Sequence, residues 1–305
     1  MNSRTWRSAS LIFAGLAILL TPIQSKASGR IVVAFDDWTL GNVGFFNPCE
    51  PGTFATNVAA WFTEGKPGRF LAWSTHAGYT GTDLASAMAS AGHIWVVDHT
   101  ASFTLTNLMT YDGVFVGGDA ADTNMLIQYV EAGGNVYVFS GGAAANYLWN
   151  GFVGHFGLEF AGTTSGGTIY PIVSTHPIFN GVDHLYGLNG TGDGTGVVDL
   201  DPSDPRNAVV ASYQGTGLFA VWDGLAPVMS IRISATQGDR VAEVEADWSS
   251  RSNSVYQLQY ASSLTISSPW TNLGVPITAQ GTNTGIRDAV PPGQGHKFYR
   301  VYLLP

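Results

Sequence analysis

The residues best suited to chemistry gather at one turn in the middle of the chain. Ser140 ends the apolar run Val136–Phe139 and is followed directly by Gly141 and Gly142. A serine on a sharp strand-to-helix turn exposes its hydroxyl, and the next backbone N–H groups can receive an oxyanion. A histidine, foremost His176, would then act as the base. One prediction is therefore a serine hydrolase.

The same turn has a simpler interpretation, which we favour. The residue two positions before Ser140 is Val138, whereas a nucleophile elbow carries glycine there. Ser140 would then cap the following helix, and the two glycines would only allow the tight turn. If a hydrolase is present, His155 and His184 are further candidate bases.

A second group of polar residues follows the first apolar run. Asp36 and Asp37 come directly after Ile31–Phe35, and Asp98-His99 end a later run in the same way. Two adjacent carboxylates bind cations or act as acid and base. The period of two in a strand points them to opposite sides, however, which favours capping and turn roles.

Metal and cofactor signatures are weak. The four aspartates of the glycine-rich stretch have a spacing that fits no EF-hand loop, so a solvated acidic loop is the better interpretation. They are Asp193, Asp199, Asp201 and Asp204. Calcium binding by this loop is the alternative. The seven histidines form no H-E-x-x-H or H-x-H pair. We expect neither a metal site nor a cofactor.

Aromatic side chains suggest one class of ligand. Trp38 and Trp73 follow or end predicted strands, where an indole ring can stack on a sugar. Trp61, Trp95 and Trp222 lie within apolar patterns and are expected in the core. A carbohydrate, or another component of the cell envelope, is therefore the candidate ligand.

The elements that must position these side chains alternate between strands and helices. We predict strands at 31–35, 69–74, 93–97, 111–116 and 136–139. Helices are predicted over 54–62 with Thr53 as N-cap, 82–91 with Thr82 as cap, 104–110, 122–132 and from the turn at Ser140 to about Phe156. Short turns between β and α units predict a mostly parallel sheet with helices on both faces.

The later part of the chain changes character twice. Residues 157–204 are rich in Gly, Thr, Asn and Asp and predict irregular structure, after which 208–213 and 218–222 form a hairpin signal. Beyond Leu225-Ala226-Pro227 the apolar residues alternate with a period of two. We therefore predict an α/β, flavodoxin-like domain over 28–225 and a small all-β sandwich over 226–305.

The N-terminus predicts export. Arg4 and Arg7 precede the apolar run Ala9–Leu20, and Ser25-Lys26-Ala27 fits a signal-peptidase site, so residues 1–27 read as a signal peptide. The apolar run is about 12 residues long, and a span needs about 20. We expect a secreted, periplasmic or cell-surface protein with no membrane insertion after cleavage.

Charge excludes one class of partner. The formal net charge is −9, and residues 28–225 hold 4 Lys and Arg against 17 Asp and Glu. Residues 226–305 are nearly neutral, with 6 against 5. An acidic domain with so few basic residues cannot bind along a phosphate backbone. Nucleic acid is therefore not an expected partner.

Two segments carry a family resemblance. The stretch Tyr111-Asp112-Gly113 to Gly117-Gly118 and the stretch Tyr129 to Phe139 resemble the class I glutamine amidotransferase-like superfamily. His176-Pro177-Ile178-Phe179-Asn180-Gly181 is similar to a segment of its trehalose-utilisation-like branch. The resemblance implies a flavodoxin-like sheet, a nucleophile position at Ser140, and a binding role for Gly117 and Gly118.

The C-terminal stretch resembles an Ig-like or fibronectin type III-like appendage of secreted bacterial proteins. The residues that carry it include Tyr256 to Gln259, Trp270 to Gly274 and Phe298 to Val301.

In the amidotransferases the base is a His-x-Glu, but His176 is followed by Pro177 and Ile178. We therefore expect a non-catalytic or degenerate domain used for ligand or glycan binding or for cell-surface assembly, with the serine hydrolase as the alternative.

Overall fold

The computed structural model describes most of the chain from residue 28 onward. It covers residues 28–45, 48–140, 145–161, 164–194, 196–204, 206–225, 229–234, 242–250, 253–263, 269–281, 283–290 and 297–304. The predicted signal peptide, Gly141 and Gly142 lie outside these residues. Among the helices of the described residues, none is both long enough and apolar enough to cross a membrane.

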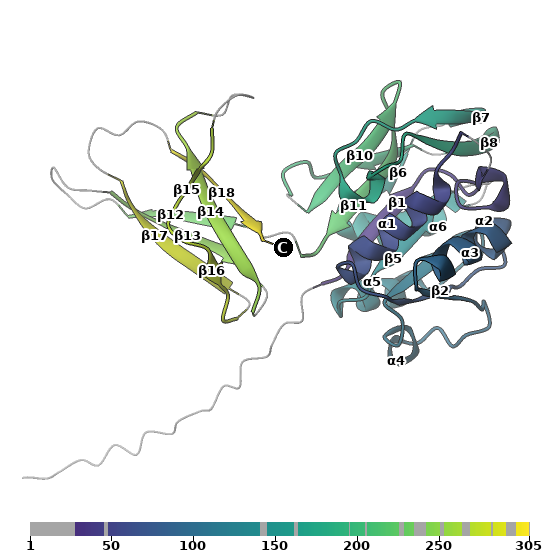
Figure 1. Ribbon diagram of the computed structural model, residues 1–305, viewed down its shortest axis with the longest axis horizontal. Coiled ribbons are helices and arrows are strands. Elements are labelled where there is room, and N and C mark those ends of the chain that lie inside the picture. The colour runs from purple at the N-terminus through teal and green to yellow at the C-terminus, as the bar shows by residue number, and fades with distance from the viewer. Residues whose placement is uncertain are drawn as a thin grey trace, which may run out of the picture.

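A seven-stranded, mostly parallel sheet forms the first part of the chain (Figure 1), which confirms the predicted fold class. Its spatial order is β10-β11-β1-β5-β4-β2-β3. β1 pairs in parallel with β5 and antiparallel with β11. The bounds are β1 Arg30–Ala34, β2 Arg69–Ala72, β3 Ile94–Val97, β4 Gly113–Val116, β5 Val136–Phe139, β10 Asn207–Tyr213 and β11 Thr216–Asp223.

The order of the parallel strands relates this sheet to the flavodoxin arrangement. The five parallel strands run β3-β2-β4-β5-β1 across the sheet. Counted from β2, this is the 2-1-3-4-5 order of flavodoxin-like folds, with β1 in the place of the fifth strand. The first strand of the chain therefore lies beside the last parallel one, so Asp36 and Ser140 end adjacent strands.

Helices cover both faces of the sheet (Figure 1). α1 and α3 lie together on one face, and α5 and α6 lie behind the sheet in the same view. The bounds are α1 Pro51–Thr63, α2 Ala77–Thr80, α3 Thr82–Ser90, α4 Leu105–Leu108, α5 Thr123–Glu131 and α6 Ala145–Val153. Three 3₁₀ helices are η1 Asn42–Phe45, η2 Gly154–Phe156 and η3 Pro177–Phe179.

The helix starts test the predicted caps. α5, predicted from Asp122 with no cap named, begins at Thr123, and the Asp122 side chain caps it by accepting from the backbone N–H groups of Asn124 and Met125. α1 begins at Pro51 behind Glu50, so Thr53 lies inside the helix and is not its cap. α3 likewise begins at Thr82 with Gly81 before it. Proline suits the first helical turn, where the backbone N–H has no partner. α1 therefore begins at Pro51, before the predicted start at Phe54.

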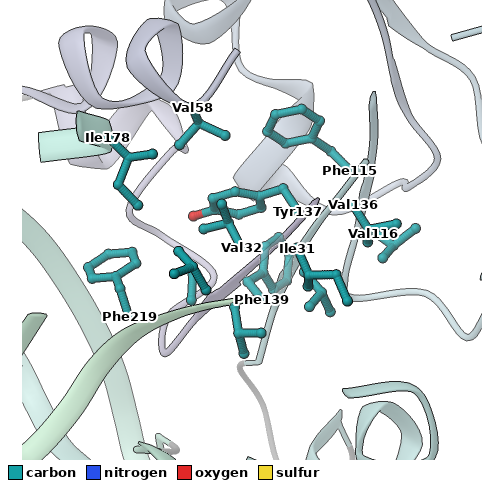
Figure 2. Close-up of a cluster of buried hydrophobic side chains, with 14 of the residues drawn as sticks. Ile31, Val32, Val58, Phe115, Val116, Val136, Tyr137, Phe139, Ile178 and Phe219 are labelled. Atoms are coloured by element: carbon teal, nitrogen blue, oxygen red, sulfur yellow. The ribbon is translucent and has the colours of Figure 1, made fainter. Parts of the chain in front are cut away.

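The core lies between the sheet and its helices. β1, β4 and β5 are buried along their whole length, as continuous apolar runs predict. Figure 2 shows Tyr137 of β5 among apolar side chains that include Phe115, Val58 and Phe219. The rings of Phe115 and Tyr137 are stacked with centroids 5.0 Å apart.

The prediction of irregular structure over residues 157–204 was wrong. The segment holds β6 Leu158–Phe160, β7 Thr164–Pro171, β8 His184–Gly194 and β9 Val197–Asp199, and β7 pairs with β8 as an antiparallel ladder. Gly, Asn and Asp are poor strand formers by propensity. Here tertiary contact decides instead, because an added Cβ at Gly187 would lie 2.6 Å from the Phe35 ring.

The last part of the chain is a sandwich of two small antiparallel sheets. β12 Met229–Ser234, β13 Ala242–Ser249 and β17 Asn283–Val290 form the first. β14 Val255–Ala261, β15 Thr271–Asn272, β16 Ile277–Thr278 and β18 Phe298–Leu303 form the second. Trp248 of the first sheet and Tyr256 and Leu258 of the second share one apolar core.

Candidate functional site

The candidate site lies at the carboxyl ends of the parallel strands. The chain leaves β1 toward α1 on one face of the sheet and leaves β5 toward α6 on the other. Such a divergence opens a crevice between adjacent strands, where open α/β sheets bind their ligands. The predicted residues Asp36, Asp37, Gly117, Gly118 and Ser140 all follow strands at this edge.

Asp36 is a buried acid at the end of β1. Only 1 % of its surface is exposed, and its Oδ1 accepts from the backbone N–H of Trp38 at 2.7 Å. The backbone N–H of Leu188 in β8 acts on this carboxyl to lower its pKa, so the β7–β8 hairpin lies beside it. Burial, reinforced by the charge of Asp37, raises the pKa of Asp36 to about 8. At neutral pH the group is therefore a neutral acid.

One oxygen of Asp36 has no partner among the described residues. Its Oδ2 is buried and makes no hydrogen bond to any described residue, and the same holds for the hydroxyl of Tyr137. The charge of Asp36 also contributes to the raised pKa of Tyr137, after burial. Buried polar atoms without partners are costly, and they concentrate where function outweighs stability. Asp36 supports the site from beneath, because a ligand at the surface cannot reach it directly.

Asp37 points away from Asp36 and holds a histidine. Its Oδ2 lies 3.3 Å from Nε2 of His76, which follows β2. The other ring nitrogen of His76, Nδ1, accepts from the backbone N–H of Gly78 at 3.0 Å. The proton therefore sits on Nε2 and faces Asp37. With both nitrogens occupied, His76 is a fixed planar group and has no nitrogen left to serve as a base.

Two glycines make room for this pair. Gly117 and Gly118 end β4 with φ of +153° and +79°. A Cβ on Gly117 would lie 2.5 Å from the Phe139 ring, and one on Gly118 would lie 2.6 Å from Cβ of His76. β4 and β5 lie between β2 and β1 in the sheet. The Gly-Gly pair lets His76, which follows β2, cross over the ends of these two strands toward Asp37.

Gly118→Ala is expected to destabilise the protein by more than the backbone cost alone. The positive φ strains any L-residue by about 1 kcal/mol, and here the new methyl group also displaces His76. Gly92→Ala is the matched control, because Gly92 has a similar φ of +83° and open space around its Cβ position. Urea denaturation of both variants measures the difference. Equal losses would show that Gly118 does not position His76.

The partly exposed rim around His76 is polar and aromatic. Asp119 accepts from the hydroxyl of Thr75 at 2.9 Å and from the hydroxyl of Ser74 at 3.2 Å. Burial acts to raise the pKa of Asp119, but hydrogen bonds from Thr75 and Ser74 outweigh it and leave the pKa lowered. The Trp38 ring lies edge-on to His76 with centroids 6.1 Å apart. A molecule at this edge would meet an indole, an imidazole and a carboxylate.

Ser140 is at the predicted position but is not exposed. It follows β5, its backbone N–H donates to the carbonyl of Ala34 at 3.0 Å, and none of its surface is accessible. Gly141 and Gly142, which would carry the oxyanion donors, lie outside the described residues. A hydroxyl at this depth does not present itself to a substrate as an elbow nucleophile does.

His176 lies at the opposite end of the sheet from Ser140. Its ring packs against Trp61 with centroids 5.1 Å apart, and Arg30 and Asp223, at the start of β1 and the end of β11, act on its charge. Burial is the main reason that the pKa of His176 falls to about 4. The structure does not bring Ser140 and His176 together, so these two residues form no catalytic pair.

A shallow groove of about 570 Å³ lies beside His176 and not beside Asp36. It is lined by Val173, Ser174, Thr175, His176, Pro177, Val209 and Val210. His176 also accepts from the backbone N–H of Ile178 through Nδ1, so it acts as the cap of η3. The groove is therefore lined by a histidine that caps η3 and by valines of the edge strand β10, and its lining contains no acid–base pair.

The other predicted residues have local roles. Asp98 accepts from Thr100, and His155 lies 3.1 Å from Glu131 on the surface. Asp201 and Asp204 accept from backbone N–H groups two residues later, as turn residues do. The described residues contain no cluster of three or more metal-ligating side chains.

The tryptophans divide much as their sequence positions predict. Trp222 is buried, and Trp61 and Trp95 pack against the core. Trp73 also packs against the core, and its Nε1 donates to the carbonyl of Ala101 at 3.0 Å. Of the two tryptophans considered for sugar stacking, Trp38 is the one that borders the rim.

Sequence reasoning missed His76. It considered Asp98-His99 after β3 but passed over the Ser74-Thr75-His76 turn after β2. The signal was the same in both places, a polar turn after a strand of the parallel sheet. Comparison of the chain with family models, with curated proteins and with solved structures finds no match.

Proposed function

We propose that the chain is an exported binding protein whose α/β domain binds a neutral carbohydrate of the cell envelope without cleaving it. The main support for this proposal is the Asp37–His76 pair, which lies over Gly117 and Gly118 with Trp38 against it. Carboxylates accept from sugar hydroxyls, and an indole face stacks on the apolar side of a sugar ring. These groups are fixed before a ligand arrives, which lowers the entropy cost of binding.

The burial of Ser140 supports binding over hydrolysis. General-base activation of a serine needs an imidazole nitrogen within about 2.6–3.2 Å of its hydroxyl. Both nitrogens of His76 have other partners, and His176 packs at the far end of the sheet. We therefore place the serine hydrolase second.

The proposal extends to family and location. We infer a degenerate member of the class I glutamine amidotransferase-like superfamily, near its trehalose-utilisation-like branch, followed by an Ig-like or fibronectin type III-like domain. Its support is the order β4, α5, Gly133-Gly134, β5, with Ser140 next. The predicted signal peptide at 1–27 supports a secreted, periplasmic or cell-surface location.

Binding of neutral oligosaccharides by the mature full chain tests the proposal. We expect calorimetry to detect at least one neutral glycan in a panel, and His76→Gln to weaken its binding at least about tenfold because the rim loses its fixed ring. His155→Gln is the matched control, since His155 lies on the surface beside Glu131. If no glycan binds, or both variants bind alike, the rim is not the site.

A separate measurement addresses hydrolysis. A fluorophosphonate probe is expected to leave Ser140 unlabelled, and Ser140→Ala is expected to bind the same glycan as the wild type. Turnover of an ester or glycoside substrate that disappears in Ser140→Ala would overturn the proposal in favour of the hydrolase.

A further inference from the structure

The outer face of the second sheet in the C-terminal sandwich carries an ordered set of polar and aromatic side chains. The register of β14 with β18 places Gln257 opposite Tyr302 and Gln259 opposite Arg300. β15 adds Asn272 opposite Gln259. Tyr256 and Leu258 alternate with these residues and point into the core. The strands can be followed in Figure 1.

Arg300 is held in one orientation on this face. Its Cζ lies 4.3 Å from the centre of the Trp270 ring and 6.0 Å from that of Tyr302. Its Nε donates to Oε1 of Gln259 at 2.9 Å. Gln259 is 8 % exposed and is fixed in turn, since its Nε2 donates to Oδ1 of Asn272 at 2.6 Å.

Within the part of the chain that the structure describes, the outward edge of the guanidinium has no partner. Arg300 is exposed, and its Nη1 and Nη2 make no hydrogen bond to any described residue. Two parallel N–H donors at a fixed angle match the two oxygens of a carboxylate. The Tyr302 ring beside them is 38 % exposed and offers an apolar face.

The charges of the domain leave Arg300 without an acidic partner. No Asp or Glu occurs in residues 249–286 or 289–305, so β14, β15, β16 and β18 contain none. Lys297 is taken by Asp288, and Arg287 lies beside Glu243 and Glu245 on the other sheet. The face therefore attracts anions, in contrast to the acidic α/β domain.

We propose that this face, defined by Trp270, Asn272, Arg300 and Tyr302, binds a uronate-containing polysaccharide. The carboxylate is received by Nη1 and Nη2 of Arg300, a sugar ring rests on Tyr302, and the amide of Asn272 donates to a hydroxyl. A single oriented guanidinium suits one carboxylate per sugar unit and not the dense charge of a nucleic acid. This site lies on different residues from the proposed carbohydrate rim and does not depend on it.

Binding of polygalacturonate to the mature full chain tests the site, with fully methyl-esterified polygalacturonate as the neutral counterpart. We expect the free acid to bind and the ester to bind at least about tenfold more weakly, because esterification removes the bidentate acceptor. Arg300→Gln should lose at least about tenfold in affinity, and Arg300→Lys should lose part of it because lysine lacks the fork.

Matched variants separate this site from general charge and from the rim. Arg287→Gln removes an exposed arginine of the other sheet and should bind as the wild type does. His76→Gln alters only the rim of the α/β domain and should also leave polygalacturonate binding unchanged. Absence of binding by the wild type, or equal losses in Arg287→Gln and Arg300→Gln, would overturn the proposal.

Discussion

Replacing Asp36 with asparagine will raise the free energy of unfolding near pH 7 and flatten its dependence on pH. The pKa of Asp36 is 3.8 for an unperturbed carboxyl and about 8 in the folded protein. Between these values the unfolded chain has released a proton that the folded protein keeps. Wild-type stability therefore falls as pH rises from about 4 to about 8, by up to about 1.4 kcal/mol per pH unit.

Asparagine removes this dependence, because it resembles the protonated acid in shape and carries no charge. Its amide oxygen can still accept from the backbone N–H of Trp38. Urea denaturation at pH 5, 6, 7 and 8 should show the advantage of Asp36→Asn growing with pH. Asp98→Asn is the control, since hydrogen bonds from Thr100 lower the pKa of Asp98 and the group is ionised in both states throughout. Parallel curves for wild type and Asp36→Asn would contradict the prediction.

This pH dependence arises from the burial of Asp36, which could not be predicted from the sequence. Adjacent carboxylates at the end of an apolar strand are visible in the sequence, and their position at the sheet edge follows from the parallel sheet. The burial of Asp36 depends on β8, within a segment whose composition argued against strands. A hairpin that forms by tertiary contact against Phe35 has no local signal.

Side chains that meet across strands were harder to foresee than the strands themselves. β4 and β5 were predictable because strands buried on both faces are continuous apolar runs. The pairing of His76 with Asp37 depends on β2 and β1 being separated by two other strands, and on glycines that leave the space between. Arg300, Gln259 and Asn272 likewise come from three strands, and only the register brings them together.

The side chain of Asn135 connects parts of the fold that its sequence position does not indicate. It follows Gly133-Gly134 and directly precedes β5. Its Oδ1 accepts from the backbone N–H of Arg30 at 2.9 Å. Its Nδ2 donates to the carbonyl of Asp112 at 2.7 Å and to that of Phe62 at 3.3 Å. One buried amide thus joins β1, the approach to β4 and the end of α1.

Asn135→Ala will therefore destabilise the protein by at least about 2 kcal/mol, because two buried backbone groups and one partly buried backbone group lose their partner, and each buried group costs about 1–3 kcal/mol. Asn135→Asp should be no better, since a carboxylate keeps the acceptor but faces two carbonyl oxygens without a donor. Gln128→Ala is the control, because Gln128 carries an exposed amide on α5 and its loss should cost under about 0.5 kcal/mol. Urea denaturation at pH 7 measures all three. A cost below about 1 kcal/mol for Asn135→Ala would mean that water replaces the amide, and the strand ends around Arg30 would then be less tightly sealed than this hydrogen bonding implies.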